Sequence, residues 1–143
     1  MRELKFRVWD KLEERFITCD SDYQGHYVLS LKGEFHNLQN GSGGKEYVVQ
    51  QYTDFKDKNG REIYEGDIVK YSRCHTESIE ISKGIFKSSL VEDGEYIGEI
   101  LYFRPSFCWS YDHKRYDDIE ELTGASHRYE IIGNIMENPE LLE

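Results

Sequence analysis

The stretch from Asp57 to Tyr71, DKNGREIYEGDIVKY, decides the fold. Asp57-Lys58-Asn59-Gly60 predicts a tight turn, because an Asn-Gly pair tolerates the positive φ angles that such turns require. Arg61–Tyr64 then predicts a returning strand, and Glu65-Gly66 predicts a bend. The alternating, β-branched run that follows, Asp67–Tyr71, predicts a further strand. Two short strands separated by glycine bends within fifteen residues indicate a β protein.

The rest of the chain continues this pattern of short strands and turns. The alternating Leu4–Trp9 predicts a first strand, and Arg15–Cys19 and Glu46–Thr53 predict two more. Two hairpins are expected, each with a two-residue link that contains glycine. Their strands are Tyr27–Leu31 with Glu34–Leu38, and Ser78–Ser82 with Ile85–Val91.

The C-terminal third predicts strands and two short helices. Tyr96–Phe103 and Ser106–Tyr111 are expected to pair across Arg104-Pro105, since proline suits a turn. Asp117–Gly124 has acids in its first turn and a closing glycine, which favours a short helix, and Asn138–Leu142 favours one helical turn with Pro139 at its first position. Between them, Arg128–Ile135 predicts a last strand.

Together these elements predict a mainly β fold: a small SH3-like barrel portion with additional β-hairpins and one or two short helices. The glycine-rich stretch Asn40–Gly44 is expected to be a flexible connector. We therefore predict a single unit over 1–143, with a subdivision into an N-terminal β subdomain at 1–50 and an SH3-like barrel at 51–143. A hairpin at about 72–93 would be inserted into the barrel.

The composition argues against several classes of protein. The 28 acidic and 18 basic side chains give a net charge of -10, which disfavours sequence-independent binding to nucleic acid. Eight of the acids lie in Asp117–Glu143, against one basic residue, so this end could face a basic partner, although a solvated surface is the commoner explanation. No apolar run approaches the roughly 20 residues of a membrane span, and no secretory signal is recognisable.

Three stretches carry a resemblance to a known family, Lys5–Asp10, Gln51–Val69 and Glu130–Leu142. Together they resemble the YopX-like proteins of bacteriophages and prophages. One departure is Asp54, which stands where relatives usually have glycine. The resemblance implies a phage-derived, cytoplasmic β protein with an SH3-like barrel portion, and it implies no catalytic residue, metal or cofactor.

Candidate chemical sites are few. Cys74 and His75 pair a thiol with an imidazole, but neighbours on a strand point to opposite faces, which makes mutual activation awkward. A metal site from Cys74, His75, Cys108 and His113 would match no zinc spacing. The chain has three cysteines, Cys19, Cys74 and Cys108, and this odd number at wide spacings indicates reduced thiols in a cytosol. No glycine-rich phosphate loop occurs, and no carboxylate pair is singled out.

The aromatic and basic patch at 102–116 is the most suggestive local feature. Its candidate contact residues mix rings with cations, as in small barrels that stack bases beside basic groups. They are Tyr102, Arg104, Phe107, Trp109, Tyr111, Lys114 and Arg115, with Phe103 and Tyr116 beside them. The alternative, that these strand aromatics alternate between core and surface, is favoured by normal burial habits.

These observations predict a cytoplasmic phage or prophage accessory protein that is not an enzyme, needs no cofactor, and acts as a protein-binding module. Its partner would be a host or phage protein. The alternative is a nucleic-acid-binding small β-barrel that uses the patch at 102–116. Exposed strand edges must be covered in some way, and a homo-oligomer is one of several solutions.

Overall fold

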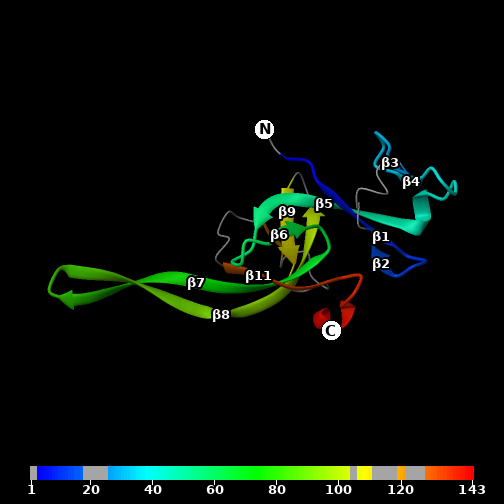
Figure 1. The fold of residues 1–143 in the computed structure, drawn as a ribbon. Helices are drawn as coiled ribbons and strands as arrows, with labels where there is room; N and C mark the ends of the chain where they lie inside the picture. The colour runs from blue at the N-terminus through cyan, green and yellow to red at the C-terminus, as the bar shows by residue number, and fades with distance from the viewer. Residues whose placement is uncertain (1–2, 18–25, 104–105, 111–118, 122–127) are drawn as a thin grey trace. The chain divides into compact units, whose positions relative to one another are not determined.

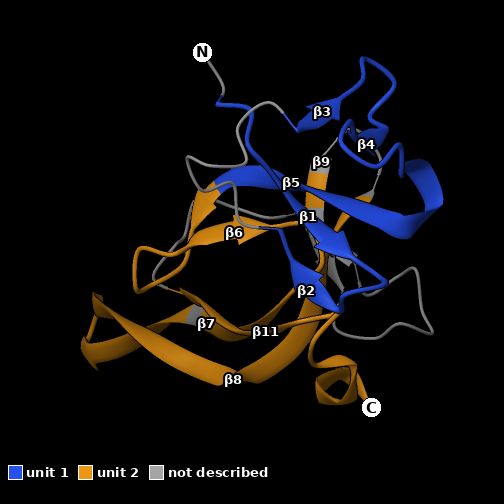
Figure 2. Cartoon of the chain, turned by 45° about the vertical axis from the view of Figure 1, so that its right-hand side comes forward, with its two compact units in different colours: residues 1–54 blue, residues 55–143 orange. Residues whose placement is uncertain are grey.

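The computed structural model describes residues 3–17, 26–103, 106–110, 119–121 and 128–143 (Figure 1). The protein is mainly β, as the sequence predicts. The elements in chain order are β1 (Phe6–Asp10), β2 (Arg15–Phe16), β3 (Tyr27–Leu29), β4 (Phe35–Asn37), the short helix η2 (Gly44–Glu46), β5 (Tyr47–Lys56), β6 (Glu62–Tyr64), β7 (Asp67–Ser82), β8 (Ile85–Phe103), β9 (Ser106–Ser110), β10 (Ile119–Glu121), β11 (Tyr129–Asn134) and the short helix η5 (Pro139–Leu142). No helix in these ranges is long and apolar enough to cross a membrane. The chain forms two compact units, Met1–Asp54 and Phe55–Glu143 (Figure 2).

In the first unit, β1 pairs antiparallel with both β2 and β5. Val8 and Trp9 are both buried, although they point to opposite faces of the strand, whereas Leu4 and Phe6 are exposed. The Trp9 ring lies edge-on to Phe16, with 4.9 Å between the ring centroids. The alternation in β1 therefore predicts the strand but not which of its residues are buried.

The predicted hairpin at 27–38 forms through β3 and β4. Phe35 is its buried anchor: its ring stacks on Tyr27 and meets Tyr47 edge-on. The stretch predicted to be a flexible connector, Asn40–Gly44, lies inside the first unit and makes local hydrogen bonds. The Asn40 side chain accepts hydrogen bonds from the amide and the hydroxyl of Ser42 because asparagine closes such turns on its own backbone.

The second unit contains a five-stranded antiparallel sheet in the order β10-β9-β8-β7-β11. The predicted hairpin with its Lys83-Gly84 link is confirmed. It is longer than expected, because the strands predicted at Asp67–Tyr71 and Tyr96–Phe103 run on without interruption into its two sides. The 72–93 segment is thus the far half of one continuous hairpin.

The prediction of a short helix at 117–124 is wrong for the three residues of this range that the structure describes. Ile119–Glu121 forms strand β10, which pairs with Cys108–Ser110 of β9. The acids and the glycine favour a helix only locally, and hydrogen bonding to an existing sheet edge outweighs so weak a preference. Residues 117–118 and 122–124 lie outside the described residues. At the C-terminus, the predicted helical turn forms as η5, but the Asn138 side chain does not cap it.

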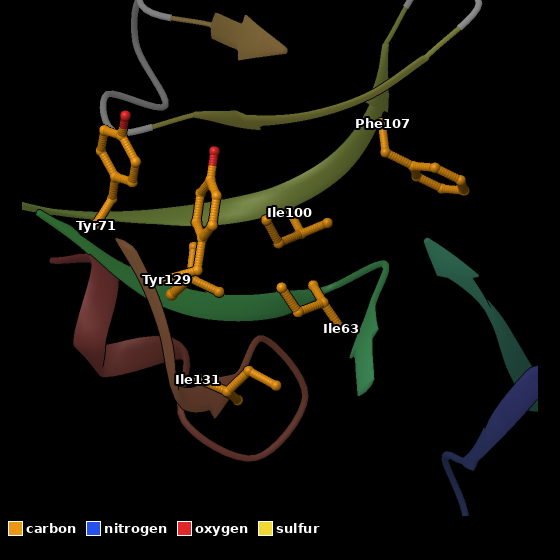
Figure 3. Packing of buried hydrophobic residues seen from close by; sticks show 7 residues of the cluster. Ile63, Tyr71, Ile100, Phe107, Tyr129 and Ile131 are labelled. Atoms are coloured by element: carbon orange, nitrogen blue, oxygen red, sulfur yellow. The ribbon is translucent and has the colours of Figure 1, made fainter. Parts of the chain in front are cut away.

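The core of the second unit lies on one face of this sheet (Figure 3). Its seven buried side chains come from β6, β7, β8, β9 and β11. They are Ile63, Val69, Tyr71, Ile100, Phe107, Tyr129 and Ile131. Tyr71 and Tyr129, which are cross-strand partners, hold their rings 4.9 Å apart. Burial of these side chains is the main favourable contribution to folding of this unit.

A buried carboxylate joins the 57–61 turn to β11. Asp57 is 3% exposed, and its Oδ1 accepts hydrogen bonds from the amides of Asn59 and Arg61, both at 2.9 Å. Its Oδ2 accepts one from the Ile131 amide at 3.1 Å. In addition, the Lys58 amide donates to the Tyr129 carbonyl. The predicted turn therefore forms and also anchors the last strand.

A second buried carboxylate acts at the next bend. Asp67 accepts a hydrogen bond from the Tyr64 amide at 2.8 Å and another from the Asn134 side chain at 3.3 Å. Between them, Gly66 has a φ of 80° and bonds through its amide to Ile100 and through its carbonyl to Ile135. The bend thus bonds to both β8 and the end of β11.

Strand β11 contains a bulge between Ile131 and Gly133. A Cβ atom on Gly133 would lie 2.8 Å from a Leu141 methyl and 2.9 Å from the Asn138 side-chain oxygen. A side chain at position 133 would therefore have to displace the side chains of Leu141 and Asn138 that pack against the bulge.

We predict that Asp57→Ala lowers the free energy of unfolding by about 2–4 kcal/mol, because it leaves three amides without their acceptor. Asp57→Asn, which keeps one oxygen, should lose less. Lys58→Ala is the control: it removes only an exposed ion pair with Glu130 and should cost less than about 1 kcal/mol. Urea unfolding measures all three, and equal stability of Asp57→Ala and Lys58→Ala would contradict the assigned role.

Asp54 has a φ of 71°, the left-handed conformation in which glycine is unstrained. We expect Asp54→Gly to raise the free energy of unfolding by about 0.5–1 kcal/mol, after part of the gain is offset by the larger freedom of the unfolded chain. Lys56→Gly, in the same strand, should lower it instead. Thermal unfolding distinguishes the two, and a loss of stability in both variants would contradict a relief of strain at residue 54.

Candidate functional site

The β7–β8 hairpin extends beyond the other strands of the second unit as a two-stranded arm (Figure 1). On one side, β11 pairs with β7 only from Asp67 to Tyr71, and on the other β9 pairs with β8 only from Glu99 to Phe103. We call residues 72–98 the arm. Within the described residues, its two outer edges have no neighbouring strand, so both present backbone amides and carbonyls along their length.

The arm exposes an unusual number of large apolar side chains. Six of them are between 40% and 64% exposed. They are Ile79, Ile81, Ile85, Phe86, Leu90 and Ile97. The most exposed leucines of the first unit, by comparison, lie outside strands, at Leu4, Leu12, Leu31 and Leu38. On the arm, exposed apolar side chains coincide over a long stretch with edges that no described strand covers, whereas in the first unit Val28 and Leu29 lie in the three-residue strand β3. Such a surface is typical of one that binds another chain.

The ends of the arm are well ordered by local interactions. At the tip, a Glu80 side-chain oxygen accepts a hydrogen bond from the Gly84 amide at 2.8 Å. At the base, Lys70 lies 3.0 Å from Glu95, and the hydrogen bond to this carboxylate, followed by its Coulomb attraction, raises the pKa of Lys70 above its usual value. A hydrogen bond with the Tyr71 side chain likewise raises the pKa of Arg128. Both cations therefore stay charged at neutral pH.

The structure divides the predicted aromatic and basic patch. Tyr102 is 56% exposed, whereas Phe107 is 6% exposed and belongs to the core, so the ring of Phe107 is not available to stack on a base. Trp109 lies in β9, where its backbone pairs with Ile100 and Glu120. The other members lie outside the described residues: Arg104, Tyr111, Lys114 and Arg115.

The thiol and imidazole candidates are described only in part. Cys74 is half-buried in β7, and Cys108 lies in β9, where it pairs with Leu101 and Glu121. His75 follows Cys74 on the arm, and His113 lies outside the described residues. Across the ranges that the structure describes, no three His, Cys, Asp or Glu side chains are grouped in a way that could hold a metal ion.

Two acids among the described residues are buried, Asp57 and Asp67, and both hold the fold by bonding to groups of β11 or its neighbouring bends. Glu65, in the predicted bend, is half-buried beside Gly66.

Sequence patterns gave one signal of the arm that pointed beyond a hairpin. Between Ile79 and Phe86, four large apolar residues flank a two-residue turn, and the adjacent Ile85 and Phe86 must point to opposite faces, whereas a half-buried hairpin needs apolar residues on one face only. Their exposure could not be predicted, because it depends on where β9 and β11 stop pairing.

Comparisons with known proteins agree with this architecture. The model of the YopX protein family matches residues 5–143. Among solved structures, protein EF1440 from Enterococcus faecalis is similar, with 27% identity, a TM-score of 0.56 and 99% of each chain covered. None of the curated proteins matches the chain.

We predict losses of stability of very different size for two cross-strand partners in the predicted aromatic and basic patch, Phe107 and Tyr102. Phe107→Ala should lower the free energy of unfolding by about 3–5 kcal/mol because it opens a cavity in the core. Tyr102→Ala should cost about 1 kcal/mol, mainly through the ring contact with Phe107 at 5.2 Å. Chemical denaturation measures both, and a similar small loss for the two variants would place Phe107 on the surface.

Proposed function

Because the chain belongs to the YopX family, we propose that it is a phage or prophage accessory protein that binds a host or phage protein in the bacterial cytoplasm, without chemistry of its own. The arm is the proposed contact surface. The observation that carries this proposal is the coincidence of exposed apolar side chains with uncovered strand edges on residues 72–98.

The physical argument begins with the marginal stability of an isolated two-stranded ribbon in water. Beyond Tyr71 and Gly98 the arm gains no support from β11 or β9, and its large apolar side chains stay in water. A partner that covers them would supply the hydrophobic contribution that the arm lacks. Edge strands also bind extended peptides through the main chain, which adds hydrogen bonds to the burial of side chains.

The rest of the second unit serves as the support in this proposal. Its sheet is curled, and we assign it as the SH3-like barrel portion expected of the family. The core under β7 and β8 holds the base of the arm, because Val69, Tyr71 and Ile100 are all buried there. A rigid base lets an exposed tip be presented to a partner in a fixed direction.

Nucleic-acid binding is the second candidate, favoured by the exposed ring of Tyr102, two residues before Arg104 in the sequence. The burial of Phe107 leaves this surface with fewer rings than the sequence indicated. The net charge of -10 also opposes it, since phosphate binding relies on positive charge.

A pull-down from host lysate tests the proposal. Tagged protein should retain a stoichiometric protein after nuclease treatment, and the same protein in purified form should then bind directly. Ile81→Ser/Phe86→Ser should weaken this binding at least about tenfold, because the exposed apolar contacts at the tip are lost. The matched control is Leu12→Ser/Leu31→Ser, which removes two exposed leucines of the first unit and should leave binding unchanged.

Equal loss of binding in both double variants would contradict the role of the arm. Recovery of nucleic acid alone, lost at high salt and after nuclease, would favour the second candidate. If the protein turned over a nucleotide or glycan, and mutating one carboxylate or Cys74 abolished this activity, the protein would be an enzyme. That result would contradict the proposal.

A further inference from the structure

We propose that Asn40 is a self-modification site, at which the backbone nitrogen of Gly41 attacks the Asn40 side chain and converts the asparagine to aspartate or isoaspartate. Ser42 and Tyr47 assist the attack through hydrogen bonds. The site lies in the first unit and not on the arm, so this inference goes beyond the proposed function and does not depend on it.

An Asn-Gly pair provides the reacting groups. Glycine has no side chain to hinder the approach of its nitrogen to the carboxamide carbon of the preceding residue, and asparagine is one of the thermally labile residues of proteins. The chain has two such pairs, Asn40-Gly41 and Asn59-Gly60, and all four residues are exposed. Its other asparagines precede leucine, isoleucine or proline. The two Asn-Gly pairs are therefore the sites to compare.

Two hydrogen-bond donors point at the carboxamide oxygen of Asn40. The Ser42 amide donates to Oδ1 at 2.9 Å and the Ser42 hydroxyl at 2.6 Å. Because a backbone amide can only donate, the atom that it bonds is the carboxamide oxygen and not the nitrogen. Attack on the carboxamide places negative charge on this oxygen, so both hydrogen bonds strengthen in the transition state. Ser42 thus provides an oxyanion hole for the reaction.

Tyr47 orients the Ser42 hydroxyl. A serine hydroxyl has one proton, which Ser42 donates to Asn40, so in the 2.8 Å hydrogen bond between the Ser42 and Tyr47 hydroxyls the tyrosine is the donor. The Tyr47 ring is itself held edge-on to the buried Phe35, with 5.0 Å between the ring centroids. Hydrogen bonds in a chain polarise one another, so Tyr47 strengthens the bond from Ser42 to Asn40.

The second Asn-Gly pair lacks this assistance. Within the described residues, no hydrogen bond reaches the Asn59 side chain, and the buried Asp57 carboxylate fixes the backbone on both sides of Gly60 through the amides of Asn59 and Arg61. The attacking amide is equally engaged at the two sites, since each glycine donates at 3.0 Å to a carbonyl, that of Asn37 at one site and that of Asp57 at the other. The donors on the carboxamide oxygen and the rigidity of the turn therefore distinguish the two sites.

The reaction consumes water and needs no cofactor. The Gly41 nitrogen loses its proton to a solvent base and forms a bond to Cγ of Asn40. The bond from Cγ to Nδ2 then breaks as water protonates Nδ2, which leaves as ammonia. Water opens the resulting cyclic imide. Hydrolysis of the new bond gives aspartate, whereas hydrolysis of the original peptide bond gives isoaspartate, in which the main chain runs through the side chain.

Tandem mass spectrometry of the purified, folded full chain tests this inference after incubation at mildly alkaline pH. Digestion in heavy-oxygen water marks any deamidation that occurs during digestion. Asn40 should convert at least about tenfold faster than Asn59. In denaturing urea the two rates should become similar, because the hydrogen bonds are lost. In the folded chain, Ser42→Ala and Tyr47→Phe should each slow the conversion of Asn40 at least about threefold, the effect of one hydrogen bond, and leave Asn59 unchanged.

Two further variants serve as controls. Ser42→Thr keeps the hydroxyl and should restore a rate close to that of wild type. Ser30→Ala removes a serine that accepts hydrogen bonds from two amides in another turn of the first unit, and it should leave the conversion of Asn40 unchanged. Circular dichroism checks that each variant is folded.

Equal rates at Asn40 and Asn59 in the folded chain would overturn the inference. Conversion in Ser42→Ala or Tyr47→Phe that is as fast as in wild type, or faster, would also overturn it, because the hydrogen bonds would then only restrain the side chain. No binding partner takes part in this reaction. A failed pull-down therefore bears on the proposed function alone.

Discussion

The carboxylate of Asp57 accepts hydrogen bonds from three backbone amides, two in its own turn and one in β11, and the second unit depends on this contact. Strand β11 is the edge of the sheet, and an edge strand is easily lost unless other contacts also hold it. Asp57 holds it through Ile131, while β7 holds it through the ladder from Tyr71 to Asp67. A buried carboxylate is tolerated here because its acceptors are satisfied by amides that would otherwise be orphaned.

Hydrogen bonds from the neighbouring bend also hold the other end of β11. Asp67 bonds to Asn134, and Gly66 bonds to Ile135, so the glycine bend and the end of the last strand fix each other. The bulge before Gly133 turns the chain so that Asn138 and Leu141 pack where a side chain at 133 would stand. These residues lie in Gln51–Val69 and Glu130–Leu142, two of the stretches that carry the family resemblance. In this chain, those two stretches therefore encode the closure of this unit.

The arm is the consequence of a sheet whose outer strands are shorter than its central pair. β7 and β8 run for 16 and 19 residues, whereas β9 and β11 have 5 and 6. The base of the central pair is held by the buried side chains of Val69, Tyr71 and Ile100. From Ser72 in β7 and from Gly98 in β8 toward the tip, β11 and β9 no longer pair with it. Exposed isoleucines beyond that point would be a liability for solubility in an isolated chain. Their presence is more easily understood if a partner covers them.

The sequence by itself determined the local features of this protein: the Asn-Gly turn, the glycine bend at Gly66, the Lys83-Gly84 hairpin and the mainly β class, because each is set by neighbouring residues. The positive φ of Asp54 agrees with the expectation of glycine there. Tertiary structure decided the rest. Ile119–Glu121 became a strand because the edge of β9 was available. Phe107 is buried whereas Tyr102 is exposed, although the two are cross-strand partners on one face of the sheet, so strand alternation alone does not decide which ring is covered. How far β9 and β11 accompany the central hairpin, and so which isoleucines stay in water, depends on contacts between segments distant in sequence, and no local pattern records them.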